Sequence, residues 1–109
     1  MAEDIIKKGT ANRWQGNDPV KGKLFLTKSR VLHIASAFHF RRGETSMPLD
    51  EIKSVEIDDN MLFKLPVPNA ITITMQDDTR HKFVVNRRKD WKKKIDRALE
   101  DMNNENIEK

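Results

Sequence analysis

The sequence predicts a mainly β protein in which about seven short antiparallel strands are capped by one amphipathic C-terminal α-helix. Two patterns lead to this fold class. Apolar and polar residues alternate in several short runs, which is the period of a strand with one buried face. From residue 87 onward the apolar residues instead recur at helical spacing, and they are Trp91, Ile95, Ala98, Leu99 and Met102.

The clearest strand pair is a hairpin over residues 20–35. Its first strand alternates between a dry side and a wet side, which are Val20, Gly22, Leu24 and Leu26 against Lys21, Lys23, Phe25 and Thr27. A polar break at 27–29 separates this strand from the apolar run 31–35. A connection of that length joins antiparallel neighbours, and other strands must cover the dry face.

Further strands are expected over residues 10–15, 45–49, 54–57, 70–75 and 80–85. Trp14 is expected to anchor the first of them. Residues 58–69 are expected to be irregular, because Pro66 and Pro68 lack amide donors and bar a central strand there.

The helix is expected over residues 87–102, with Asn86 as its N-cap. Trp91 lies early in the apolar stripe and should be its main buried anchor. We therefore predict a single domain over residues 9–102, a loosely ordered N-terminus over 1–8 and a flexible C-terminal tail over 103–109.

Three segments resemble the GRAM domain family, a branch of the pleckstrin-homology-like superfold. The segments are GKLFLTKSR at 22–30, GETSMPLDEIKSV at 43–55 and FVVNRRKDW at 83–91, and the resemblance covers residues 9–99. It implies a pleckstrin-homology-like (PH-like) barrel or sandwich, with two nearly orthogonal sheets and a helix across one corner. It implies no catalytic residues, because the family shares no catalytic set.

Composition narrows the class of protein further. A chain of 109 residues suits one domain, and the absence of cysteine excludes disulfides and thiolate chemistry. The charged N-terminus does not resemble a signal peptide, and no apolar run is long enough for a membrane-spanning helix. We expect a cytoplasmic protein. The net charge of +4 favours an anionic partner, and a solubilising surface is the alternative explanation.

Catalytic and metal-binding patterns are not found in the sequence. His33, His39 and His81 lack metal-ligand spacing, and the acidic pairs at 58–59 and 77–78 are typical of turns. The glycines are scattered and form no phosphate-binding loop. We therefore predict a non-catalytic binding module without a cofactor or metal.

The first candidate binding site is the start of the helix. Its cations lie where the helix dipole is already positive, and they are Arg87, Arg88, Lys89, Lys92 and Lys93. Helix-start amides together with cations form an anion site. We predict that a protein segment or another anionic ligand binds this face. A solvated helix face without a ligand is the alternative.

A weak contact with anionic, phosphoinositide-like membrane lipid is an alternative function. Arg41 and Arg42 would supply the charge, and the proline-bounded apolar loop 61–67, with Met61, Leu62 and Phe63, would insert. The same loop could instead fold back and plug the end of the barrel. Nucleic-acid binding is a second alternative, weakened by the lack of an exposed aromatic platform.

Overall fold

The computed structural model of the chain describes residues 4–15, 18–36, 43–62 and 65–108. Within these ranges, seven strands precede one long C-terminal helix, as predicted. In chain order the elements are β1 (Ile5–Gln15), β2 (Asp18–Thr27), β3 (Arg30–Ala35), β4 (Glu44–Pro48), the 3₁₀ helix η2 (Leu49–Glu51), β5 (Ile52–Leu62), β6 (Leu65–Met75), β7 (Arg80–Val85) and α1 (Arg88–Glu108).

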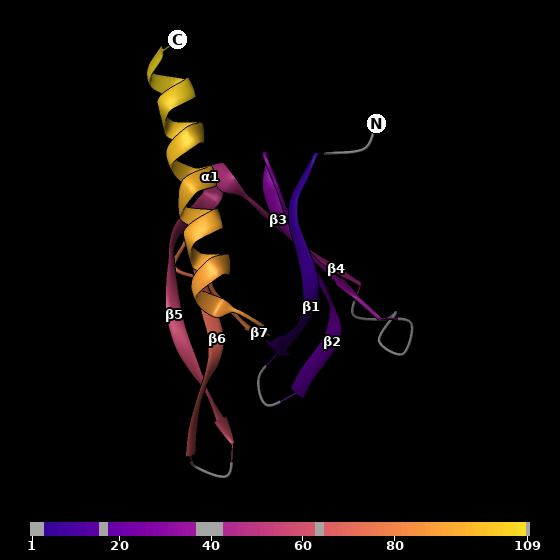
Figure 1. The fold of residues 1–109 in the computed structure, drawn as a ribbon. Coiled ribbons are helices and arrows are strands. Elements are labelled where there is room, and N and C mark those ends of the chain that lie inside the picture. Colours follow the sequence, from indigo (N-terminus) through magenta and orange to yellow (C-terminus); the bar gives the residue numbers. More distant parts are fainter. Residues whose placement is uncertain (1–3, 16–17, 37–42, 63–64, 109) are drawn as a thin grey trace.

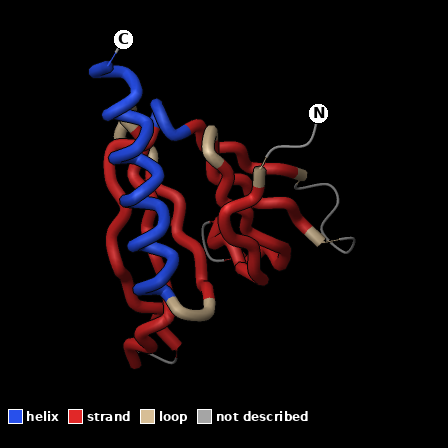
Figure 2. Tube along the Cα trace, turned by 45° about the horizontal axis from the view of Figure 1, so that its top comes forward, coloured by secondary structure: helices blue, strands red, loops and turns tan. Residues whose placement is uncertain are grey.

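The strands form one antiparallel sheet in the order β4-β3-β2-β1-β7-β6-β5. Residues 11–14 of β1 pair with residues 82–85 of β7, and this short ladder joins the two halves of the sheet. The halves lie at an angle to each other, and α1 lies beside the half made of β5, β6 and β7 (Figures 1 and 2). The expected two sheets are therefore two halves of one continuous, bent sheet.

The helix is packed against the strands as its periodicity predicts. Trp91, Ile95 and Ala98 are buried in the same hydrophobic cluster as the inward-facing strand residues, and Leu99 and Met102 pack partly against it. Burial of this stripe removes apolar surface from water, which is the main favourable contribution to folding. The C-terminal part of α1 extends past the ends of the strands (Figure 1).

The hairpin between β2 and β3 explains two residues of the GRAM-like motif. The Thr27 hydroxyl oxygen accepts hydrogen bonds from the amides of Ser29 and Arg30, both at 3.1 Å, and so closes the turn. Gly22 has no side chain at a point of close approach, because a Cβ there would lie 2.1 Å from the carbonyl oxygen of Ile34. A glycine in a strand is typical of such a backbone approach.

The expected irregular segment at 58–69 is wrong, because β5 and β6 form one long hairpin through most of it. Pro66 is opposite Met61 in this hairpin, whereas β7 pairs with β6 only over residues 70–74. The prolines thus lie where β6 has a neighbour on one side alone, and proline is tolerated at such an edge. The paired ends of β5 and β6 extend beyond the other strands (Figure 1).

Both ends of the ordered structure differ from the expected boundaries. Strand β1 begins at Ile5, so residues 5–8 belong to the sheet, and Lys7 donates a 2.7 Å hydrogen bond to Asp90. Helix α1 continues to Glu108, past the expected end at Met102. Local composition did not reveal these extensions, because pairing with β2 and with α1 is what orders the N-terminal residues.

Candidate functional site

The helix start is built differently from the sequence expectation. The amides of Asp90 and Trp91 donate to the carbonyl oxygen of Arg87 at 3.0 and 3.1 Å, so Arg87 occupies the capping position. The expectation that Asn86 caps the helix is wrong, because α1 begins one residue later, at Arg88. Arg87 has φ +58°, a left-handed conformation that costs a non-glycine residue roughly 1–2 kcal/mol.

A cavity of about 700 Å³ lies at this point, and we call it the helix-start cavity. It is formed where the end of β7 turns into α1 beside the middle of β6. Its lining residues are Asn69, Val85, Asn86, Arg87, Arg88, Lys89, Asp90 and Lys93. Four of the five cations predicted from the sequence therefore surround one cavity, and the fifth, Lys92, does not line it.

Two of these five cations already interact with other residues of the fold. Arg88 donates from Nη1 to the carbonyl oxygen of Asp58 at 2.7 Å and so ties the helix start to β5. Lys92 forms an ion pair with Asp96 at 2.6 Å. Arg87, Lys89 and Lys93 are exposed, and none of the three has an ion pair with a described residue. These three are the cations available to a ligand.

The acid that lines this cavity, Asp90, is already neutralised by a lysine of β1. Asp90 accepts the 2.7 Å hydrogen bond from Lys7, and this bond is the main reason why the pKa of Asp90 lies below its usual value. The Lys7 ammonium also lies 5.1 Å from the centre of the Trp91 ring, which favours its position by a cation–π contact. The helix-start cavity therefore keeps an excess of positive charge.

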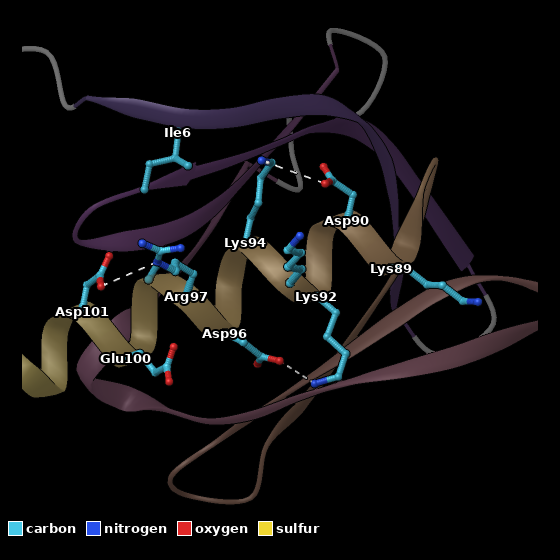
Figure 3. A pocket seen from close by; sticks show the side chains of 11 residues that line it. Ile6, Lys89, Asp90, Lys92, Lys94, Asp96, Arg97, Glu100 and Asp101 are labelled. Carbon is cyan, nitrogen blue, oxygen red and sulfur yellow. Dashed lines mark hydrogen bonds and ion pairs between the residues drawn. The ribbon is translucent and has the colours of Figure 1, made fainter.

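Lys92 lines a second cavity of about 700 Å³, which lies between α1 and the beginning of β1 (Figure 3). Ile6 points into this space from β1. Six of the nine charged side chains of α1 that line it form pairs one turn apart: Lys92 with Asp96, Lys94 with Asp90 and Arg97 with Asp101. The other three are Lys89 and Lys93, which also line the helix-start cavity, and Glu100. Because acids and cations alternate and most of them are paired, this face resembles a solvated helix surface rather than an anion site.

A third cavity, of about 570 Å³, lies on the outer face of β1, β2 and β3, and we call it the sheet-face groove. Lys21, Lys23 and Phe25 line it, and these are the residues that period-two spacing placed on the wet side of the hairpin. The period-two alternation was the one signal that these side chains share a face. It carried no information about the cavity, because the depth of a surface depends on the neighbouring strands.

The residues proposed for lipid contact cannot be placed as a site. Arg41, Arg42 and Phe63 lie outside the described residues. Met61 and Leu62 belong to the end of β5, and their side chains also lie outside the described part. In the described ranges no helix is long and apolar enough to cross a membrane.

The two described histidines, His33 and His81, are buried or partly buried in the fold. His33 is buried, and its Nε2 donates a 2.9 Å hydrogen bond to the carbonyl oxygen of Ala11. Burial lowers the pKa of His33 and of His81, and the nearby Arg13 lowers both further. No group of three potential metal ligands occurs among the described residues.

Comparison with solved structures identifies the fold. The Vps36 N-terminal PH domain matches with a TM-score of 0.69 at 18% identity, over 92% of this chain and 81% of that one. The C-terminal domain of an unknown protein from Leishmania infantum matches with a TM-score of 0.75 at 15% identity, over 89% of this chain and 84% of that one.

A Slm1 PH domain in complex with phosphoserine matches with a TM-score of 0.67 at 15% identity, over 88% of this chain and 96% of that one. A Slm1 PH domain in complex with inositol-4-phosphate matches with a TM-score of 0.59 at 14% identity, over 86% of this chain and 92% of that one. No protein-family model and no curated sequence matches the chain. The fold is thus PH-like, whereas membership of the GRAM family stays a prediction.

Proposed function

We propose that this protein is a non-catalytic binding module that holds an anionic group, of the phosphate type, in the helix-start cavity. The observation that carries the proposal is the gathering of Arg87, Lys89 and Lys93 around one cavity whose only acid, among the described lining residues, is paired with Lys7. A phosphate group on a protein segment or on a small molecule would meet the same three cations.

The backbone adds to this attraction. The first amides of a helix have no acceptor within the helix, and the helix dipole places partial positive charge beside them. A site with amides, a positive dipole end and cations suits an anion well. Without a ligand, cations at this end of a helix are unfavourable, by about 0.3–1 kcal/mol each at low ionic strength.

Arg87 adds a second unfavourable feature at the same position. Its left-handed backbone is a conformation that glycine adopts without strain, yet the chain has arginine there. Strained residues cluster at binding sites, where the function of the side chain offsets the backbone cost. Binding of an anion by the guanidinium group would supply such an offset.

The structural comparisons support the class of ligand. A Slm1 PH domain, which shares the fold, forms complexes with phosphoserine and with inositol-4-phosphate. The PH-like fold is therefore compatible with ligands that carry a phosphate monoester. The residues that would bind such a ligand in this chain are inferred from the helix-start cavity alone.

The test is an amide NMR titration of the full chain with phosphoserine and with inositol-4-phosphate. We expect shifts centred on residues 86–93, and we expect the charge reversals Lys89→Glu and Lys93→Glu together to weaken binding about tenfold or more. The matched control is Lys28→Glu with Lys53→Glu, which changes the net charge equally at exposed sites elsewhere.

Arg87→Gly separates binding from folding in the same experiment. It removes the guanidinium group and relieves the left-handed strain, so it should weaken binding while the melting temperature stays equal or rises. Equal weakening in the control pair, or shifts confined to other surfaces, would overturn the proposal. Sedimentation with anionic vesicles and titration with an oligonucleotide test the membrane and nucleic-acid alternatives, and tighter binding to either would replace it.

A further inference from the structure

The sheet-face groove shares no lining residue with the helix-start cavity and has its own chemistry. Its lining residues come from three adjacent strands and the residue after β3: Thr10, Asn12, Lys21, Gly22, Lys23, Phe25, Ile34, Ala35 and Ser36. Residues paired directly across neighbouring antiparallel strands share a face of the sheet. Lys23 is paired with Thr10 on one side and with Ile34 on the other, so the three form one row across the groove.

A second row lies parallel to the first and adds to the apolar floor. Phe25 is paired with Lys8 and with Leu32. Phe25 is half-buried, and Ile34 is 38% exposed, so apolar surface is accessible at the bottom of the groove. Lys8, an exposed residue of β1, lies beside Phe25 in this row.

The groove carries positive charge that no ion pair with a described residue compensates. Lys21 and Lys23 are exposed, and neither has an ion pair with a described residue. None of the described lining residues is acidic. The nearest acid in the row is Glu44, which is paired with Ile34 from the edge strand β4 and does not line the groove.

This combination selects a ligand with an apolar group between negative charges. The apolar floor provides the hydrophobic contact, and the lysines provide charge complementarity, which selects acidic partners and excludes basic ones. Asn12 and Thr10 add uncharged hydrogen-bonding groups that suit the backbone of an extended peptide. A flat membrane suits this surface less well, because insertion into a bilayer needs apolar side chains that protrude, and this floor is recessed.

The groove also lies close to the helix-start cavity. A smaller cavity of about 180 Å³ shares Thr10 and Asn12 with the groove and shares Asn69, Val85 and Asn86 with the helix-start cavity. Neighbouring strands lie about 4.8 Å apart, so the path from β2 across β1 to β7 is roughly 10 Å, or about three residues of extended peptide.

We propose that the sheet-face groove is a docking surface for an acidic segment of a partner protein. One apolar side chain of that segment lies on the floor formed by Phe25 and Ile34, and flanking carboxylates lie near Lys21 and Lys23. This proposal goes beyond the binding of an anionic group at the helix start, because it uses different residues and does not require a phosphate.

The probe is a synthetic peptide of about eight residues, with one phenylalanine between glutamates and aspartates. Two matched peptides serve as controls: one has alanine for the phenylalanine, and the other has glutamine and asparagine for the acids. Amide NMR of the full chain should show shifts at residues 10–12, 21–25 and 34–36 with the first peptide, and each control peptide should bind about tenfold more weakly or worse.

The variants Lys21→Glu and Lys23→Glu together should also weaken the peptide about tenfold, with phosphoserine binding unchanged within about twofold. Lys28→Glu with Lys53→Glu is again the control pair, and the amide spectrum of each variant reports whether the fold is intact. Ile34→Ser, at an exposed position, tests the floor and should remove the preference for phenylalanine over alanine.

Several results would overturn the proposal. Equal binding of all three peptides would show that the groove does not select this chemistry, and shifts confined to residues 86–93 would place the peptide at the helix start. Concentration-dependent shifts of the groove residues without peptide would identify a contact between two copies of the chain. Tighter binding of the same face to anionic vesicles would identify a membrane surface.

Discussion

Trp91→Ala tests whether α1 is held on the sheet by the contact that we describe. Trp91 is 2% exposed and belongs to the main hydrophobic cluster. Its ring lies against the backbone of β1, since a Cβ added at Gly9 would be 3.5 Å from Cζ2 of Trp91. Truncation removes a fully buried indole and leaves a cavity between α1 and this strand.

The expected loss is about 3–5 kcal/mol of unfolding free energy, which is the usual range when a buried large aromatic side chain is replaced by alanine. Small domains have ~5–15 kcal/mol in total, so the variant should be close to unfolding. The melting temperature should fall by about 12 °C or more, because each kcal/mol corresponds to ~4 °C or more in a chain of this length.

The assay is thermal and urea unfolding followed by far-UV circular dichroism, which does not depend on the deleted fluorophore. Lys93→Ala is the control, since Lys93 is exposed on the same helix and its loss should change stability by no more than about 0.5 kcal/mol. An unchanged melting temperature in Trp91→Ala would mean that α1 is not packed on the strands as described.

Gly22→Ala should destabilise the protein by roughly 1–3 kcal/mol in urea unfolding, because the added Cβ would meet the carbonyl oxygen of Ile34 at 2.1 Å and force β2 from β3; wild-type stability in this variant would contradict the described pairing. Burial lowers the pKa of His33, so the folded state resists its protonation, and stability should fall as the pH drops below 6.5 toward the lowered value. Urea midpoints at about pH 7.5 and pH 5.5 measure this loss, and His33→Gln should make it smaller; an equally large loss in that variant would assign it to other groups, such as His81.

Much of the fold follows from local alternation. Ile71 and Ile73 in β6 and Phe83 and Val85 in β7 are buried, as their period-two spacing predicts. The pattern is informative because each of these strands has one face against the core along this stretch. It does not report where a strand ends, and β5 and β6 therefore continue beyond the predicted limits.

The error at residues 58–69 has a specific physical origin. Proline excludes a strand only where both sides of that strand need backbone hydrogen bonds. Pro66 lies in a part of β6 that pairs with β5 and not with β7. The lengths of neighbouring strands decide whether the missing amide matters, and no local composition rule contains those lengths.

The candidate site, like the fold, could be predicted from the sequence only in part. The closeness of Lys89 and Lys93 could be predicted, because residues four apart on a helix are neighbours. The hydrogen bond from Arg88 to Asp58 and the pairing of Lys7 with Asp90 join residues that are distant in the chain, and these contacts decide which charges a ligand can use.

The amino-acid pattern alone thus specified most of the strands, the helix and their buried faces, because buried side chains recur with a fixed period along a strand or a helix. The three-dimensional packing decided which cations share a cavity and which are already paired. Each such contact contributes about 1 kcal/mol or less at a surface, and it leaves no periodic pattern in the sequence. It forms only where folding brings separate strands and the helix together.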